Sequence, residues 1–301
     1  MSKIQDALKK LQGGSKQGSP EQQTTTATKQ RRLPKTVIPI ARQKQLFLDT
    51  AKHHLDEKSL IRGGLLAPLD HAVPVSDEFR RIKRPLIENF INSPNTKDEK
   101  MNLILVSSSI PGVGKTFCSV NLAASISLER ELNVLLVDAD VAKPHITRAF
   151  GLAGHTGLID ILEDESRSID EALVRTDLND IQVLPAGRRH SQSTELLASD
   201  RMETIMGELA TRYSDRIIIL DSPPLLMTSE AQALAKQVGQ IALVIESGKT
   251  VHHEVEETLE LLDRDKVICA ILNKSIYAQP GGYYGGGYGY YGFNEEEEEE
   301  G

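Results

Sequence analysis

The sequence predicts an α/β protein with a mostly parallel β-sheet and helices on both faces of that sheet. Between residues 101 and 273, short apolar runs rich in β-branched residues alternate with longer amphipathic segments. This alternation is typical of parallel strands connected by helices. A loop of small residues follows the first apolar run, and acidic residues follow two of the others. Because ligands of such sheets bind at the carboxyl ends of the strands, these features indicate a binding site at one edge.

Short apolar runs are the expected strands, and longer amphipathic segments between most of them are the expected helices. The runs are Leu103–Val106, Val134–Val137, Ile181–Leu184, Ile217–Leu220, Ile241–Ile245 and Val267–Leu272. The clearest helical segments are Thr194–Tyr213, Ser229–Val238 and Val251–Leu262. Since the runs are continuously apolar and do not alternate with polar residues, both faces of the sheet should be buried.

The loop after the first apolar run has the pattern of a phosphate-binding loop. A strand, a small-residue loop, the triplet Gly-Lys-Thr and a helical pattern from Phe117 to Leu128 follow one another. Gly112 and Gly114 allow backbone N–H groups to approach phosphate oxygens. We expect Lys115 to reach the β- and γ-phosphates of ATP and the Thr116 hydroxyl to bind Mg²⁺. The expected nucleotide-binding residues are Ser109, Pro111, Gly112, Val113, Gly114, Lys115, Thr116 and Phe117.

Ser109 stands where the usual phosphate-loop pattern has a glycine. Serine is small, so this departure changes the expectation little. The alternative is a chance glycine-rich turn in front of a helix. Two further nucleotide-type motifs downstream favour the first interpretation, and the predicted fold is therefore that of a P-loop NTPase.

Acidic residues follow two of the predicted strands. Asp138 and Asp140 follow Val134–Val137, and Asp221 follows Ile217–Leu220. Side chains alternate along a strand, so Asp138 and Asp140 should emerge on the same face. An aspartate after an apolar strand can be a helix cap or a turn residue, but in P-loop enzymes it holds Mg²⁺. Three of them in a sheet that also carries the loop predict a magnesium and catalytic site.

Composition limits the classes of function. The formal net charge of −8 argues against non-specific nucleic-acid binding as a main role. Cys118 and Cys269 lie in apolar patterns and should be small buried residues, not a disulfide or metal pair. No signal peptide and no apolar run of about 18 residues is present, which predicts an intracellular protein. Such a protein would reach a membrane through a partner or a surface helix.

The segments outside the sheet differ in composition. Residues 1–36 combine a short amphipathic helical pattern with a polar, disordered linker. Residues 37–74 form an irregular arm that could contain a helix near Gln43–Leu55. The P-loop domain is expected over residues 75–275, followed by a flexible Tyr/Gly-rich and acidic tail at 276–301. The first helix could bind a partner or a membrane surface, or it could simply be a frayed terminus.

A helix is expected over Val75–Ile91, with Ser76 as its N-cap and a kink or interruption at Pro85. One face is apolar and carries Phe79, Ile82, Leu86, Ile87 and Phe90. The other face carries Glu78, Arg81 and Arg84 at every third position. These charges could pair within the helix. They also form a self-complementary surface that suits a neighbouring copy of the chain.

The tail contains a cluster of tyrosines separated by glycines. The cluster consists of Tyr283, Tyr284, Tyr288, Tyr290 and Tyr291. It could be a low-complexity aromatic segment, or a set of tyrosine hydroxyls on a tether. Ten residues from Asn273 to Tyr283 span at most roughly 35 Å, which is enough to reach a site on an adjacent subunit. The glutamate run after the tyrosines is a solvated acidic segment for which the sequence suggests no sharper role.

Taken together, the motifs resemble those of the bacterial tyrosine kinases of exopolysaccharide and capsule systems. The matching segments are SSSIPGVGKT, LLVDADVAKPH, IIILDSPPLL, the Glu78/Arg81/Arg84 stripe and the tyrosine cluster, and they cover about Ser76 to Tyr291. The arm with its GLLAP segment looks most like the tyrosine autokinases associated with exosortase. After Asp-Ala-Asp the family commonly has several basic residues, whereas this sequence has only Lys143.

The resemblance implies a protein-tyrosine kinase that transfers phosphoryl groups from ATP and uses Mg²⁺. By position, Lys115, Asp138 and Asp140 would be catalytic, and Thr116, Asp138 and Asp221 would hold the metal. Either Asp138 or Asp140 would accept the tyrosine proton. Glu78, Arg81 and Arg84 would assemble a ring-like homo-oligomer whose members phosphorylate the tail tyrosines of one another.

The family also implies partners and a location. These are a membrane polysaccharide co-polymerase as activator, a tyrosine phosphatase, and a cytoplasmic position at the inner membrane, reached through a partner. The implied role is the regulation of exopolysaccharide synthesis or export.

Two alternative functions share the nucleotide-binding motifs. Partition- and septum-positioning ATPases have this fold, but they usually carry a lysine where this chain has Ile110, and they lack a tyrosine tail. A catalytically silent ATP-binding scaffold is the other alternative. The presence of Lys115, Asp138, Asp140 and Asp221 argues against it.

Overall fold

The computed structural model describes residues 52–68, 74–93, 100–213 and 215–275. All of them belong to one compact unit that begins at Lys52. The expected N-terminal helix, the linker and the tail tyrosines lie outside the described residues. Within the described part of the chain, no helix is both long enough and apolar enough to cross a membrane.

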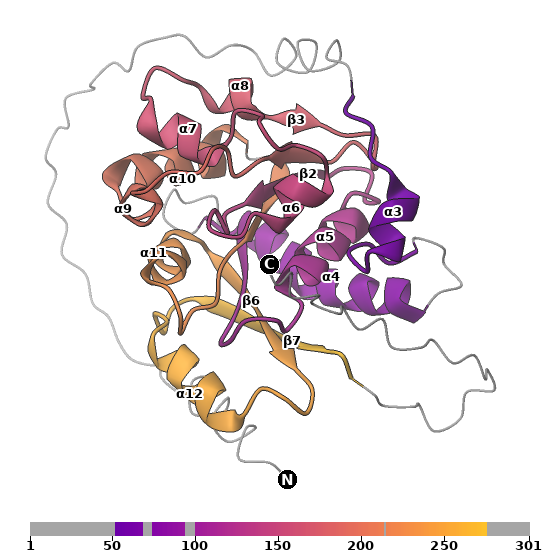
Figure 1. Ribbon diagram of the computed structural model, residues 1–301. Coiled ribbons are helices and arrows are strands. Elements are labelled where there is room, and N and C mark those ends of the chain that lie inside the picture. Colours follow the sequence, from indigo (N-terminus) through magenta and orange to yellow (C-terminus); the bar gives the residue numbers. More distant parts are fainter. Residues whose placement is uncertain (1–51, 69–73, 94–99, 214, 276–301) are drawn as a thin grey trace, which may run out of the picture. The chain divides into compact units, whose positions relative to one another are not determined.

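The described residues form a seven-stranded sheet with the strand order β3-β4-β2-β5-β1-β6-β7 (Figure 1). The strands are β1 Leu103–Ser108, β2 Asn133–Asp138, β3 Val174–Arg175, β4 Gln182–Leu184, β5 Arg216–Asp221, β6 Gln240–Glu246 and β7 Val267–Asn273. All neighbouring pairs are parallel except β3 and β4. The predicted mostly parallel sheet is confirmed, and β3 is an additional short strand that the apolar pattern does not reveal.

Helices cover both faces of the sheet. The helices are α3 Glu57–Arg62, α4 Pro74–Asn92, α5 Lys115–Ile126, α6 His145–Ala149, α7 Leu158–Glu163, α8 Ile169–Ala172, α9 Ser193–Leu197, α10 Asp200–Arg212, α11 Ser229–Gln237 and α12 His252–Glu260. Figure 1 shows α9, α10 and α11 on one side of the sheet and α3, α4 and α5 on the other. Alternate residues of β1 separate accordingly, because Leu103 and Leu105 join one core cluster and Ile104 and Val106 join the other.

The predicted helix Thr194–Tyr213 is wrong as a single element. It is divided into α9 and α10, and Ser199 between them has an extended backbone. The Ser199 hydroxyl accepts a hydrogen bond of 3.3 Å from the backbone N–H of Met202 and so begins α10. A serine followed by Asp200 is a helix-start pattern that the amphipathic period obscured. The short helices α6, α7 and α8 were also not expected.

Helix α4 runs through Pro85 without a break, so the expected interruption there is wrong. The expected N-cap at Ser76 is also wrong, because the helix already begins at Pro74. Proline removes the hydrogen bond to the carbonyl four residues earlier, here that of Arg81. Both Pro85 and Arg81 are exposed, so water can bind that carbonyl. Meanwhile Lys83 before the proline and Leu86 after it are buried, so the helix is held in place on both sides of the proline.

The arm in front of α4 packs against the sheet. Where the sequence suggested a helix near Gln43–Leu55, the described part of that range is extended and not helical. His53 forms a parallel bridge with Thr176, and its backbone N–H donates to the Arg175 carbonyl at 2.7 Å. Further along the arm, Leu55, Leu60 and Leu66 join one of the two core clusters.

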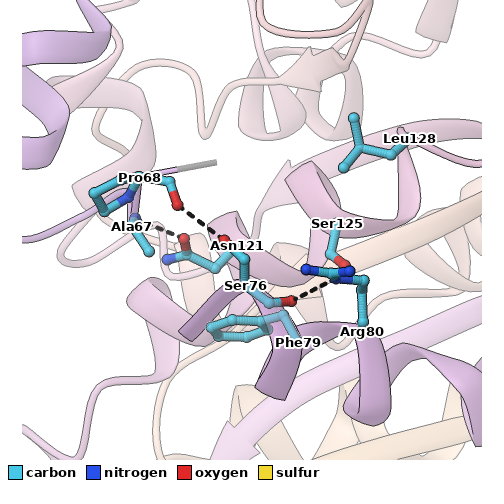
Figure 2. Close-up of a pocket in the computed structure, with 8 residues that line it drawn as sticks. All are labelled: Ala67, Pro68, Ser76, Phe79, Arg80, Asn121, Ser125 and Leu128. Carbon is cyan, nitrogen blue, oxygen red and sulfur yellow. Dashed lines mark hydrogen bonds between the residues drawn. The ribbon is translucent and has the colours of Figure 1, made fainter. Parts of the chain in front are cut away.

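Asn121 of α5 fastens the arm to the helix that follows the phosphate loop. Its Oδ1 accepts a 2.7 Å hydrogen bond from the Ala67 N–H, and its Nδ2 donates to the Leu65 carbonyl at 3.0 Å. Figure 2 shows Asn121 between Ala67 and the residues of α4. Nearby, the Phe79 and Phe117 rings meet edge to face with their centroids 5.9 Å apart. The side chain next to Thr116 therefore packs directly on α4.

Lys83 makes a second, buried link between α4 and α5. The residue is 4% exposed, its Nζ donates to the Ser125 carbonyl at 2.6 Å, and it lies 2.8 Å from Glu129 Oε1. We expect Lys83→Ala to lower the free energy of unfolding by about 1–3 kcal/mol, because it leaves the Ser125 carbonyl without its partner. Urea denaturation measures this value. The matched control is Lys58→Ala in α3, which removes an exposed lysine and should change stability by less than about 0.5 kcal/mol. Equal losses of stability from the two substitutions would contradict the conclusion that Lys83 links α4 to α5.

Candidate active site at the carboxyl edge of the sheet

The carboxyl ends of three central strands bring the predicted acidic residues and the phosphate loop together. Asp138 at the end of β2 pairs in register with Asp221 at the end of β5, and Val106 of β1 also pairs with Asp221. Side chains paired in register project from the same face of a sheet. The two carboxylates are therefore neighbours, beside the loop that follows β1.

The loop has the backbone conformation of a phosphate cradle. Gly112 and Gly114 have φ angles of 76° and 93°, and Gly114 directly precedes α5. A Cβ on Gly114 would lie 2.2 Å from Asn273 Nδ2, so any other residue would be strained there and would displace Asn273. Since α5 begins at Lys115, its free N–H groups and partial positive charge face the loop.

The end of β7 holds the loop from outside. Asn273 Nδ2 donates to the Val113 carbonyl at 2.8 Å, and Lys274 Nζ donates to the Gly112 carbonyl at 3.0 Å. Because the Gly112 and Val113 carbonyls are both hydrogen-bonded, the peptide groups of the loop that contain them are held in one orientation. No motif of the sequence marks Asn273 or Lys274 as part of the site. The feature that could have indicated them is their position, because Asn273 and Lys274 are polar residues directly after the last apolar run, at the edge where ligands bind.

Ser109, which replaces the usual glycine, is buried and hydrogen-bonded. Its Oγ lies 2.7 Å from Thr258 Oγ1 of α12, and that Thr258 hydroxyl donates to the Glu254 carbonyl at 2.7 Å. The Thr258 proton is thereby used, so the Ser109 hydroxyl must donate to Thr258. The extra hydroxyl is satisfied within the fold, which explains why serine is accommodated.

Lys115 and Asp221 form the buried centre of the site. Lys115 is 9% exposed, and burial lowers the pKa of its ammonium group, while Asp221 and Asp140 oppose that shift. Burial raises the pKa of Asp221 to about 6, against hydrogen bonds from the hydroxyls of Thr116 and Ser119. The Ser119 bond to Asp221 Oδ1 measures 2.8 Å. Thr116 and Asp221, both predicted metal ligands, therefore lie in contact, and Ser119 joins them.

Asp138 is fully buried and only half satisfied. Its Oδ2 accepts bonds from the Thr147 N–H at 2.8 Å and the Thr147 hydroxyl at 2.7 Å. Its Oδ1 is buried and has no hydrogen-bond partner among the described residues. Burial, followed by the charge of Asp221, raises the pKa of Asp138 to about 7. An unpartnered carboxylate oxygen beside a second carboxylate suits a cation or a water bound to one.

Asp140 differs from Asp138 in being reachable from solvent. It is partly exposed, and its Oδ1 accepts a 3.0 Å hydrogen bond from the Lys143 N–H. Burial raises the pKa of Asp140, while that hydrogen bond and the charge of Lys115 oppose the shift. A substrate hydroxyl can approach this carboxylate, whereas Asp138 has no exposed surface.

Most of the predicted site converges, and two predicted groups lie elsewhere. Lys115, Thr116, Asp138, Asp140 and Asp221 meet at one edge of the sheet. The charged residues Glu78, Arg81 and Arg84 are exposed on α4 and do not join this centre. The tail tyrosines lie outside the described residues. The described residues contain no group of three or more His, Cys, Asp or Glu that could hold a metal by themselves.

Comparisons with known proteins agree with this geometry. Residues 101–263 match the model of the AAA domain family. The chain is 32% identical to the tyrosine-protein kinase YwqD of Bacillus subtilis (strain 168) over 62% of this chain and 79% of YwqD. It is 30% identical to the succinoglycan biosynthesis transport protein ExoP of Rhizobium meliloti (strain 1021), over 71% of this chain and 29% of ExoP. Among solved structures, the VpsO kinase domain is 28% identical, with a TM-score of 0.52 over 65% of this chain and 96% of that domain.

These matches agree with the residues that converge at the carboxyl edge. The family model covers β1 and the phosphate loop, and it extends over Asp138, Asp140 and Asp221. YwqD matches over most of its own length, whereas the match with ExoP covers less than a third of that protein. On the combined evidence of its AAA domain, its carboxyl-edge site and its similarity to YwqD, the chain belongs to the bacterial tyrosine kinases.

Proposed function

We propose that this kinase transfers the γ-phosphoryl group of ATP to the tail tyrosines of a neighbouring copy and thereby regulates exopolysaccharide synthesis or export. The observation that carries the proposal is the meeting of Lys115 with Asp138, Asp140 and Asp221 beside the phosphate loop. Phosphoryl transfer needs little covalent chemistry from the protein. It needs positioning and neutralisation of charge, which this arrangement can supply.

The residues of the site fit ATP and Mg²⁺. The loop from Ser109 to Phe117 would bind the phosphates, and Lys115 would neutralise charge that grows on them. Thr116, Asp138 and Asp221 would hold Mg²⁺, for which the unpartnered Asp138 Oδ1 provides a free ligand oxygen. Bound there, the ion supplies positive charge to the β- and γ-phosphate oxygens.

Asp140 is the residue that we propose to accept the tyrosine proton. The sequence left Asp138 and Asp140 as equal candidates. A free tyrosine has a pKa of about 10, so its hydroxyl must lose a proton to a nearby base during transfer. Asp138 is 0% exposed and already accepts two hydrogen bonds from Thr147, whereas Asp140 is partly exposed.

The exposed face of α4 supports assembly of a ring-like oligomer. Glu78, Arg81 and Arg84 are exposed, and none of them forms an ion pair with another described residue. The charge of Arg84 also acts on Glu129 of its own chain, but all three side chains are exposed and can face the same helix of a neighbouring copy, as the family resemblance implies. A ring would bring each tail to the site of the next subunit.

The wider role that we propose comes from the family. ExoP is by its name a succinoglycan biosynthesis transport protein. By analogy, the activator of this kinase would be a membrane co-polymerase for a polysaccharide, and a tyrosine phosphatase would reverse the modification. The kinase would then act at the cytoplasmic side of the inner membrane, held there by its partner.

Intact mass spectrometry after incubation with Mg·ATP tests the activity. We expect successive additions of about 80 Da, the mass of one phosphoryl group, confined to the 277–301 peptide and removed by a tyrosine phosphatase. Lys115→Met should show none, because it lacks the charge that stabilises transfer. To test transfer between chains, Lys115→Met protein is mixed with wild-type protein, and its own tail should then gain mass.

The negative outcomes distinguish the alternatives. ATP hydrolysis without added mass, also in the presence of a co-polymerase segment, would favour a positioning-type ATPase. Neither hydrolysis nor added mass under those conditions would indicate an ATP-binding scaffold. Mass gained only by the chain that carries Lys115 would contradict transfer between copies.

A further inference from the structure

A group of exposed cations lies beside the active site, and the charge of one of them, Lys143, also acts on Asp140. Lys143 precedes α6, Arg148 lies within α6, and Arg189 follows β4; all three are exposed and form no ion pair with another described residue. We refer to Lys143, Arg148 and Arg189 as the α6 basic patch. Arg188 is not a member, because Asp160 and Glu163 already neutralise it.

The patch is close to the groups that perform the transfer. The Lys143 N–H donates to Asp140 Oδ1 at 3.0 Å. His145 lies between Lys143 and Arg148 in the sequence, and its pKa is lowered by partial burial and then by the charge of Arg148, while Asp140 opposes the shift. The Ala186 N–H donates to Thr147 Oγ1 at 2.9 Å, which joins the segment leading to Arg189 to α6. In Figure 1, α6 lies beside β2, whose last residue is Asp138.

The chain itself contains a segment of complementary charge. Glu295–Glu300 is an uninterrupted run of six glutamates, which contribute six of the negative charges behind the formal net charge of −8. Tyr291, the last tyrosine of the cluster, is four residues before Glu295. Four residues span at most about 14 Å. A glutamate run bound at the patch would therefore hold the last tyrosines within reach of Asp140.

We propose that the α6 basic patch binds the Glu295–Glu300 run of a neighbouring copy and so presents Tyr288, Tyr290 and Tyr291 for phosphorylation. This inference rests on the proposed function and adds the basis of substrate recognition. Each exposed ion pair contributes only a few tenths of a kcal/mol, so three pairs change the substrate KM by about tenfold. The effect decreases at about 0.5 M salt, because the Debye length is then shorter than the separation of most exposed pairs.

Kinetics with the full-length kinase and a peptide of residues 277–301 test the proposal. The comparison peptide carries glutamine at all six positions of the glutamate run. We expect its KM to be about tenfold higher at low salt, with kcat changed less than about twofold. The double variant Arg148→Glu/Arg189→Glu should raise the KM of the glutamate peptide by at least tenfold, because two attractions become repulsions, whereas the KM of the uncharged glutamine peptide should change by less than about twofold.

Two further measurements separate recognition from general damage. The control charge reversal is Arg264→Glu. Arg264 is exposed and precedes β7, so it lies at the amino ends of the strands, away from the active site, and its reversal should leave the KM unchanged. A peptide with six lysines at 295–300 should recover the lower KM with the double variant. Equal KM values for the glutamate and glutamine peptides would overturn docking while tyrosine transfer remained established. A wild-type kinase that phosphorylates no tyrosine at all would refute the proposed function, and the docking proposal with it.

Discussion

Replacing Gly114 with alanine should lower the nucleotide affinity by about 100-fold and the free energy of unfolding by about 2–3 kcal/mol. Gly114 has a φ of 93°, a conformation that is strained for alanine. The new Cβ would also meet Asn273 Nδ2 at 2.2 Å and displace it from the Val113 carbonyl. Strain, the lost hydrogen bond and the shifted loop therefore act together. Urea denaturation and calorimetric titration with ATP measure the two effects.

The matched control for this substitution is Gly207→Ala. Gly207 lies inside α10, and nothing is found within 4 Å of its added Cβ. Alanine favours helix over glycine, so we expect a gain of about 0.5–1 kcal/mol in stability and an unchanged affinity for ATP. If Gly114→Ala bound ATP as tightly as Gly207→Ala, the loop would not depend on its left-handed glycine.

Replacing Asp138 with asparagine should stabilise the nucleotide-free protein and at the same time nearly abolish phosphoryl transfer. Burial raises the pKa of Asp138 to about 7 and that of Asp221 to about 6. In the unfolded chain both groups release their protons near pH 4, so between pH 4 and 7 the folded state binds more protons. Stability contributed by these groups is therefore present at low pH and decreases as the pH rises through 7. Removing one charge of the pair should raise stability at pH 8 by about 1–3 kcal/mol.

Activity should change in the opposite direction. Without the carboxylate at position 138, a proposed ligand of Mg²⁺ is lost, and we expect kcat to decrease by about 10²–10³-fold. Asp140→Asn should also reduce kcat, but it should keep the Mg²⁺ dependence of nucleotide binding. Thermal denaturation from pH 5 to 8 with and without Mg·ADP, together with the mass assay, measures these effects. An Asp138→Asn protein that is less stable than wild type at pH 8 would contradict the inference that the buried carboxylates of Asp138 and Asp221 destabilise the folded protein when both are charged.

Much of the fold follows from local sequence. The central strands are continuous apolar runs. A run such as Ile217–Leu220 forms a buried strand whichever strands lie next to it, because both faces of a parallel sheet are covered. The phosphate loop was equally predictable, because its glycines, lysine and threonine act through the backbone next to them. Asp138, Asp140 and Asp221 could be assigned to one site because parallel strands end at the same edge.

Other features depend on residues that are distant in the sequence. Strand β3 is only Val174–Arg175 and exists through its antiparallel pairing with β4. The arm contains few apolar residues, yet Leu55, Leu60 and Leu66 are buried against the sheet. Asn273 and Lys274 support the phosphate loop from positions 160 and 162 residues away. No local pattern encodes such contacts, because they arise only when the last strand is added next to β6.

The order of the strands also sets where tension between the two ends of the described chain would act. The described chain enters at the β3 edge, through the bridge between His53 and Thr176, and leaves after Asn273 at the β7 edge. A pull applied between residues 52 and 275 would be directed across the strands and would load these two edges first. At the β7 edge it would withdraw Asn273 from the Val113 carbonyl before it separated β2, β5 and β1, which lie inside the sheet. The phosphate loop would therefore respond to force before the central strands that carry the carboxylates.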